Sequence, residues 1–231
     1  GMFGGLIGAQ VLSIVADTFP YEKRGRAMST IFMAFAIASV FGVPFSLYLA
    51  NMISWHAPFV FIAIVGAPIA YLIMRYLPQM RGHLLPREGV KRYRPNVGQT
   101  LKEVFGNKSQ VMALLLSGSL MLGHFMIIPF INPYMEFNVG FSKSQTPMIY
   151  MVGGVSAFLS SFAIGRMSDK YGKLRVFVIC LLLSIIPIFF ITNMPAISFY
   201  AVLGIFSFWF TFSTGRNIPA QAMISTVVES A

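Results

Sequence analysis

The stretch GRMSDKYGKLR, residues 165–175, gathers five charged side chains in a chain of which only 10% is charged. The five are Arg166, Asp169, Lys170, Lys173 and Arg175. Residues 146–164 before the stretch and residues 176–215 after it contain no Asp, Glu, Lys or Arg. A short charged segment therefore joins two long apolar segments, and each is about long enough to cross the hydrocarbon core of a membrane.

The composition of the whole chain agrees with this interpretation. Of the 231 residues, 56% are hydrophobic and 15% are aromatic, and the mean hydropathy is +0.73. These values predict an integral membrane protein, and backbone groups in lipid must be hydrogen-bonded internally, so the apolar segments are expected to be helices. Seven spans are expected, at residues 1–16, 27–50, 57–77, 110–132, 146–164, 176–193 and 195–228.

The basic residues are concentrated in alternate connecting segments. Segments 17–26, 75–109 and 165–175 together hold fifteen of the seventeen Lys and Arg residues. By the positive-inside rule, these segments should face the cytoplasm. In a soluble protein the net charge of +10 would suggest a nucleic-acid partner. Here the location of the charge favours anionic lipid at the inner membrane surface, and no nucleic acid is expected as a partner.

The longest basic segment predicts the division of the chain. Residues 78–109 contain three prolines and seven of the seventeen Lys and Arg residues, as is typical of a linker. We expect residues 1–77 to form the end of one helical half and residues 110–231 the start of a second. A weak internal repeat with an offset of 211 residues supports this duplication. Its four identities are Gly4/Gly215, Ile7/Ile218, Ala9/Ala220 and Gln10/Gln221.

The stretch at 165–175 resembles the signature of the Major Facilitator Superfamily, which lies in a short cytoplasmic loop between two spans. With residues 78–109 as the central loop of that family, the seven spans match helices four to ten. The resemblance thus implies part of an all-α, polytopic transmembrane bundle with two pseudo-symmetric six-helix halves. It also implies that this chain lacks helices one to three, eleven and twelve.

The resemblance implies a secondary active transporter that works by alternating access. Proton-coupled efflux of a drug-like compound or a sugar across the plasma (bacterial inner) membrane is the expected activity. The sequence shows no nucleotide-binding loop, so an ion gradient would supply the energy. An intramembrane enzyme is not expected, because the three histidines lie in unrelated contexts and the acids avoid the spans. A transporter-like sensor or a channel without carrier activity remains the alternative.

The resemblance also implies a cytoplasmic gate built on Asp169. Its carboxylate would reach the start of the helix near Ala27, where unpaired N–H groups and the helix dipole favour a negative charge. The four neighbouring basic residues could instead serve only membrane topology. Asp17 is expected to pair with Arg24, Arg26 or Arg166, unless it is a solvated helix-end charge. The expected gate comprises Asp17, Arg24, Arg26, Gly165, Arg166, Ser168, Asp169, Lys170, Gly172, Lys173, Arg175 and Glu229.

Polar residues inside the spans are candidates for substrate binding. Arg216 is the strongest, because a guanidinium at membrane depth is costly and normally faces a cavity or a partner; the alternative is an arginine that snorkels to the inner surface. His124 could take part in proton coupling or could be a neutral, hydrogen-bonded histidine. The predicted substrate-binding set is Gln10, His124, Asn132, Arg216, Asn217 and Gln221.

Two further features are a Gly and Pro pair in the second span and a single cysteine. Gly42 and Pro44 resemble a degraded form of the antiporter motif in helix five of the family, although proline kinking and close packing would explain them in any transporter. The single cysteine, Cys180, offers neither a disulfide nor a thiolate metal site. No cofactor and no metal ion are expected. The expected partners are a small-molecule substrate, protons and membrane lipid.

Overall fold

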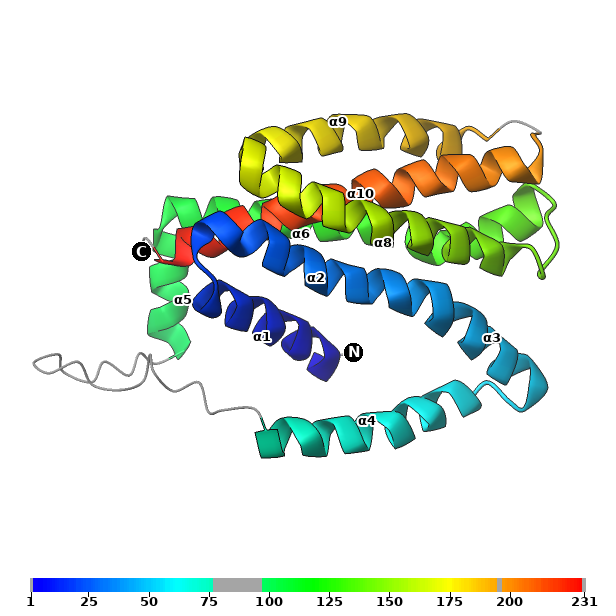
Figure 1. Cartoon of the computed structure of the whole chain (residues 1–231), viewed down its shortest axis with the longest axis horizontal. Helices are drawn as coiled ribbons and strands as arrows, with labels where there is room; N and C mark the ends of the chain where they lie inside the picture. The colour runs from blue at the N-terminus through cyan, green and yellow to red at the C-terminus, as the bar shows by residue number, and fades with distance from the viewer. Residues whose placement is uncertain (1, 77–96, 195–196, 230–231) are drawn as a thin grey trace, which may run out of the picture. The chain divides into compact units, whose positions relative to one another are not determined.

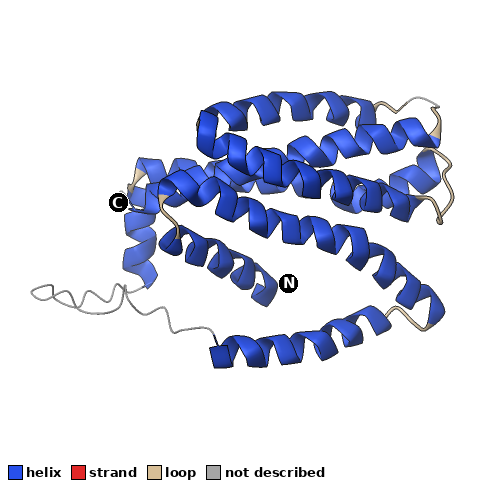
Figure 2. Ribbon diagram, in the orientation of Figure 1, coloured by secondary structure: helices blue, strands red, loops and turns tan. Residues whose placement is uncertain are grey.

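The structure, a computed structural model, describes residues 2–76, 97–194 and 197–229. Over these ranges the secondary structure is helical and contains no strand (Figures 1 and 2). The all-α prediction is therefore confirmed. Much of the apolar surface of the helices is exposed, as expected for residues that face lipid rather than water.

Five of the described helical stretches are long and apolar enough to cross a membrane. They are Tyr21–Ala50, Ala57–Tyr76, Lys108–Asn138, Thr146–Tyr171 and Lys173–Thr192. Helices also form at the two remaining predicted spans, as α1 (Met2–Thr18) and α10 (Phe199–Glu229), although these two do not belong to the five. The multi-pass membrane character of the chain thus follows from its own helices.

The chain separates into two compact units, Gly1–Pro44 with Asn107–Ala231, and Phe45–Gly106. The second unit contains α4 (Ala57–Tyr76), α5 (Val97–Gly106) and most of α3 (Val43–Met52). Within it, the rings of Phe45 and Phe61 pack edge to face at 5.0 Å between centroids. The division of the sequence at 78–109 stays a prediction, and residues 78–96 of that linker lie outside the described residues.

The first unit holds the core of the protein. Its main helices are α2 (Arg24–Ile37), α6 (Lys108–Phe125), α8 (Thr146–Tyr171), α9 (Lys173–Thr192) and α10. Figure 1 shows α8, α9 and α10 side by side, with α2 along α8. Trp209 and Phe206 of α10 are fully buried at the centre of the largest apolar cluster. Lipid is as apolar as these side chains, so close packing rather than exclusion from water holds the helices together.

A π-helical turn interrupts the second predicted span. Residues Ala38–Gly42 form this turn, labelled η2, between α2 and α3. Pro44 explains its position, because proline has no N–H to donate to the carbonyl one helical turn before it. Gly42 does not serve close packing among the described residues, since a Cβ added there would meet no atom within 4 Å.

The helices extend further into the charged segments than the apolar runs indicate. α8 continues through the signature stretch to Tyr171, and α9 begins at Lys173. Only Gly172 separates them, with a φ of 95°, a backbone conformation that glycine adopts without strain. The expected loop at 165–175 is therefore a single-residue turn between two helices. Likewise, α2 begins at Arg24 rather than near Ala27.

Candidate functional site

The carboxylate of Asp169 lies at the N-terminus of α2. Its Oδ1 accepts a hydrogen bond from the backbone N–H of Gly25 at 3.0 Å, and its Oδ2 accepts one from the N–H of Arg26 at 3.0 Å. Both amides belong to the first turn of α2, which has no partners for them within the helix. The side chain of Asp169, on α8, thus caps a helix that precedes it by more than 140 residues.

Lys173 completes this arrangement. Its ammonium lies 3.3 Å from Oδ1 of Asp169, and the two side chains are only 4% and 8% exposed. The same nitrogen donates to the carbonyl of Tyr21 at 2.7 Å and lies 3.9 Å from the centre of the Tyr21 ring. We call Asp169, Lys173 and the first turn of α2 the Asp169 cluster. Its buried opposite charges are paired, as low-dielectric surroundings require.

Two glycines let α2 and α8 approach closely enough for these bonds. A Cβ added at Gly25 would lie 2.5 Å from Oδ1 of Asp169 and 2.9 Å from the carbonyl oxygen of Gly165. A Cβ added at Gly165 would lie 2.6 Å from the Cβ of Ser29. Any larger residue at either position would push the two helices apart. Gly165 of the expected gate thus meets a specific partner on α2, Gly25, which the sequence alone did not identify.

Arg24 joins three helices next to the cluster. It is 4% exposed. Its guanidinium donates to the carbonyl oxygens of Ala16 at 2.7 Å and Phe19 at 3.0 Å, and to the hydroxyl of Ser225 at 3.2 Å. Ala16 lies in the last turn of α1, where carbonyl groups lack partners within the helix. The side chain thus ties the end of α1 and α10 to the start of α2.

The other predicted gate residues lie in more varied surroundings. The side chains of Arg26, Arg166, Lys170 and Arg175 are exposed, and Arg166 packs over the ring of Phe162 at 3.8 Å. Ser168 is fully buried, and its hydroxyl finds no partner among the described residues. Glu229 ends α10, and its side chain lies outside the described part of the structure.

The predicted pairing of Asp17 is not found. Its side chain is exposed, and no ion pair within the described ranges joins it to Arg24, Arg26 or Arg166. Arg24 donates to two backbone carbonyls and a hydroxyl.

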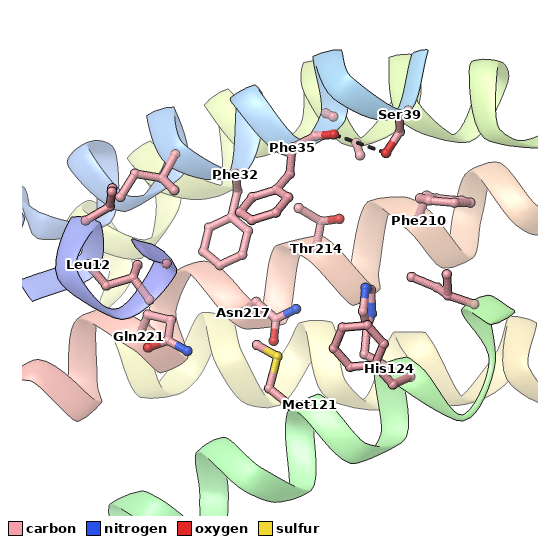
Figure 3. A pocket seen from close by; sticks show the side chains of 18 of the residues that line it. Leu12, Phe32, Phe35, Ser39, Met121, His124, Phe210, Thr214, Asn217 and Gln221 are labelled. Atoms are coloured by element: carbon pink, nitrogen blue, oxygen red, sulfur yellow. Dashed lines mark hydrogen bonds between the residues drawn. The ribbon is translucent and has the colours of Figure 1, made fainter. Parts of the chain in front are cut away.

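A cavity of about 660 Å³ opens between α1, α2, α6, α8 and α10 (Figure 3). Most of the residues that line it are apolar, and Phe32 and Phe35 of α2 provide aromatic surface on one side. Five lining residues are polar and carry no formal charge. They are Ser39, His124, Thr214, Asn217 and Gln221. The volume and the mainly apolar lining with a few polar groups are typical of small-molecule sites.

Three of the six predicted substrate-binding residues line this cavity: His124, Asn217 and Gln221. Nδ1 of His124 shares a hydrogen bond with the hydroxyl of Ser213 at 3.2 Å, and its ring stacks on Trp209 with 5.8 Å between centroids. The amide nitrogen of Asn217 donates to the carbonyl of Ser213 at 3.0 Å. The two side chains are therefore held in place through the same residue of α10.

The remaining three predicted binding residues lie outside the cavity lining. Arg216 is 8% exposed, and its guanidinium donates to the hydroxyl of Ser184 on α9 at 3.2 Å. It thus lies buried between helices and, in this conformation, does not line the cavity. Gln10 is exposed, although its repeat partner Gln221 lines the cavity. Oδ1 of Asn132 is buried, with no partner among the described atoms.

Sequence reasoning missed several of the lining residues. Phe32, Phe35, Met121 and Phe210 look like ordinary lipid-facing or core residues in an apolar chain, and nothing in the sequence marks them. Thr214 could have been found, because it lies three residues before Asn217 and seven before Gln221, a spacing that places all three on one face of α10. Ser39 carried no such signal, and its hydroxyl donates to the carbonyl of Phe35 at 3.0 Å.

Comparison with known proteins agrees with this architecture. The sequence profile of the family described as Major Facilitator Superfamily matches residues 1–231. The Bacillus subtilis protein named "Uncharacterized MFS-type transporter YybF" is 29% identical over 206 residues, which cover 85% of this chain and 47% of the relative. A "Chloramphenicol resistance protein" of Streptomyces lividans is 24% identical over 162 residues, which cover 70% and 40%. A "Probable sugar efflux transporter" of Helicobacter pylori is 25% identical over 175 residues, which cover 73% and 42%.

The matches cover only part of the length of each relative. The chain spans less than half the length of these three relatives, and no solved structure shows significant similarity to it. The family consists of transporters rather than enzymes, which agrees with the prediction that this chain is not an enzyme. Since the family profile matches the chain from end to end and the helices are those of a multi-pass membrane protein, this chain belongs to the Major Facilitator Superfamily.

Proposed function

We propose that this chain is part of a secondary active transporter that moves a small molecule across the plasma membrane by alternating access. Three observations support the proposal: family membership, the membrane-spanning helices and a cavity of about 660 Å³ between them. Alternating access requires a cavity whose two sides open in turn, so a contact that closes one side must form and break in each cycle.

The Asp169 cluster is the observation that carries this proposal, because it has the properties of such a contact. It joins α2 to α8 by two charge-assisted hydrogen bonds and one ion pair. A carboxylate at a helix N-terminus contributes ~0.3–2 kcal/mol, and a hydrogen bond to a charged group about 1.5–3 kcal/mol. Reversing a balance from 1:99 to 99:1 needs about 5.5 kcal/mol. The cluster is therefore strong enough to hold the inner side closed and weak enough to break.

The direction of transport, its coupling to an ion gradient and the contact with lipid are part of the same proposal. We propose efflux in exchange for protons, with His124 as a proton-binding group in the cavity wall and a drug-like compound or a sugar as the substrate. The names of the two relatives with a stated function and the resemblance of Gly42 and Pro44 to the antiporter motif support this choice. Anionic lipid is the proposed partner of the basic linker between the helical groups.

Counterflow in proteoliposomes tests the carrier function. The protein expressed from its native gene would be reconstituted with unlabelled chloramphenicol or sugars inside, and uptake of the labelled compound would be followed. A carrier accumulates label transiently with saturable kinetics, whereas a channel or a sensor does not. Asp169→Asn should slow counterflow roughly tenfold, because loss of about 1.4 kcal/mol of gate stabilisation shifts the conformational balance by that factor. Unchanged counterflow in this variant would refute the gate.

Proton coupling needs a separate measurement. An imposed pH gradient, acidic on the side from which protons would enter, should drive substrate movement in the opposite direction. A protonophore should abolish this drive and leave counterflow intact. If the protonophore leaves the driven movement unchanged, coupling to protons is wrong and another ion must supply the energy.

A further inference from the structure

With His124 neutral, the cavity wall carries no formal charge in the described part of the chain. Its nineteen lining residues include no Asp, Glu, Lys or Arg, and fourteen of them are apolar. Arg216, the charged residue next to Asn217 in α10, directs its guanidinium to Ser184 and does not line the cavity. An ion moved into such surroundings loses its hydration and gains no counter-charge, which is strongly unfavourable. The lining therefore favours a neutral occupant.

Asn217, a residue that lines this wall, has an unused hydrogen-bond acceptor. The residue is 4% exposed, and its amide nitrogen donates to the carbonyl oxygen of Ser213 at 3.0 Å. A carbonyl can only accept, so this bond fixes which end of the amide is the nitrogen. The other end, Oδ1, is buried and has no hydrogen-bond partner among the described atoms. A buried acceptor without a partner costs about 1–3 kcal/mol, and an occupant with a donor would recover this free energy.

The side chains around Asn217 indicate the chemistry of the rest of the bound molecule. Figure 3 shows the side chains of Asn217, Thr214 and Met121 around the same space, with Phe32 and Phe35 on the facing helix. Aromatic and thioether side chains favour apolar and aromatic groups. A molecule that fits must therefore place most of its surface against apolar side chains and direct one donor at Oδ1 of Asn217.

We propose that the transported substrate is a neutral, largely apolar molecule with a hydroxyl or N–H donor, and that Oδ1 of Asn217 accepts the hydrogen bond from that donor. That this molecule is transported rests on the proposed function, whereas its binding at Asn217 does not. Asn217 thus determines specificity by rejecting analogues that lack the donor. Such analogues leave the acceptor buried and unpaired.

Four probes of similar shape separate the effect of ligand charge on binding from the effect of a hydrogen-bond donor. Triphenylmethanol is neutral and has one hydroxyl donor, and its methyl ether keeps the shape without the donor. Tetraphenylphosphonium and tetraphenylborate have a similar aromatic body with a positive or a negative charge. Binding of each tritiated probe would be measured by equilibrium dialysis of the purified full-length protein, with protein-free micelles as the blank. The alcohol should bind about tenfold more tightly than the ether, as expected for one hydrogen bond, and more tightly than either ion.

Two variants test the role of Asn217. Asn217→Leu keeps the size of the side chain and removes the acceptor, so the alcohol and the ether should bind equally. Asn132→Leu is the matched control, because Oδ1 of Asn132 is also buried without a partner among the described atoms but lies outside the cavity lining. This control should keep the tenfold preference. Size-exclusion chromatography of both variants would show whether each is folded.

The results separate this inference from the proposed function. Equal binding of alcohol and ether, tightest binding of an ion, absence of binding by all four probes, or an unchanged preference in Asn217→Leu would each overturn the inference. If Asn217→Leu is not folded, Asn217→Asp gives a second test: the alcohol should still bind more tightly than the ether because the carboxylate is an acceptor, and the phosphonium should become the tightest ligand. Binding with the expected preference but without counterflow would refute the transport function and leave the inference on Asn217 intact.

Discussion

The Asp169 cluster and the cavity lie in the same unit of the molecule, but their chemistry is opposite. The cluster consists of a carboxylate, an ammonium and backbone amides, all paired at 3.0–3.3 Å. The cavity is lined by apolar and uncharged polar side chains, and at Asn217 it includes an acceptor that the described residues leave unpaired. When a contact that closes a gate forms, its polar and charged groups must all be hydrogen-bonded or ion-paired. A binding site must keep groups unsatisfied until its ligand arrives.

This contrast predicts where substitutions will act. Changes at the Asp169 cluster should alter the packing of α2 against α8, and therefore stability and the rate of the transport cycle. Changes in the cavity wall should alter which ligands bind, with little effect on stability.

Replacement of Gly25 by leucine should have the largest effect. Even the Cβ would lie 2.9 Å from the backbone carbonyl oxygen of Gly165, which cannot turn away as a flexible side chain could. The helices must separate, and Asp169 then loses its hydrogen bonds to α2. We expect the free energy of unfolding in mixed micelles to fall by about 3 kcal/mol, the upper end for overpacking, and counterflow to be lost.

Gly118→Leu on α6 is the control for this substitution. A Cβ added at Gly118 would meet no atom within 4 Å, so the added side chain should be tolerated with a change in stability below about 0.5 kcal/mol, as is usual for open positions. If both variants lose the same stability, the close approach of α2 and α8 is not what Gly25 provides.

Replacement of Arg24 by methionine should have the next largest effect. Methionine preserves much of the apolar stem but leaves the carbonyls of Ala16 and Phe19 without this donor. The expected loss is about 2 kcal/mol, within the range for buried groups deprived of a hydrogen bond, and it should be concentrated at the end of α1. Amide hydrogen exchange would show faster exchange in α1 than in α8.

Arg24→Lys provides the comparison, because it keeps the positive charge but cannot donate to several acceptors in a fixed geometry. It should restore only part of the protection of α1. Full protection in the lysine variant would mean that charge alone matters. Unchanged exchange in Arg24→Met would contradict the role of Arg24 as a link between helices.

The predictability of the two sites from the sequence also differs, for a physical reason. Charge is rare in a membrane-spanning chain, so Asp169, Lys173 and Arg216 were visible as candidates without any structure. Helix phase and packing decide which uncharged residues meet in space, so Phe32, Met121 and Phe210 could not be recognised. The same limit explains why the partner of Arg216 could not be predicted. Its cost at membrane depth predicted a partner, but that partner is Ser184 on α9 rather than a group in the cavity.

The helices themselves were predictable in type and approximate position, but their ends were not. The apolar runs located them, whereas the helices continue into charged segments where the lipid constraint no longer applies. At the signature stretch, α8 and α9 occupy every residue except Gly172, which lies in the turn between them. Sequence reasoning therefore placed Asp169 in a loop, whereas the structure places it in the last turn of α8.

Replacement of Lys173 by methionine should have a moderate effect. It removes the ion pair with Asp169, the hydrogen bond to the carbonyl of Tyr21 and the contact with the Tyr21 ring. Asp169 keeps its two backbone hydrogen bonds, so we expect a loss of only about 1–2 kcal/mol in stability and a several-fold slower counterflow. Lys170→Met is the control, because Lys170 is exposed and contributes charge to the same segment. Equal effects would favour a role in topology for both lysines.

Replacement of Asp17 by asparagine should have the smallest effect, and it tests the comparison most directly. Asp17 and Asp169 are both aspartates in segments expected at the inner side, yet Asp17 is exposed and makes no ion pair within the described ranges. Exposed charges contribute little, so Asp17→Asn should change stability by less than about 0.5 kcal/mol and leave counterflow within twofold of the wild type. If Asp17→Asn slows counterflow as strongly as Asp169→Asn, the capping of α2 is not the property that makes a carboxylate a gate here. The total negative charge at the inner side would then be the determinant, and counterflow by both variants should depend on ionic strength, because salt screens exposed charges more than buried ones.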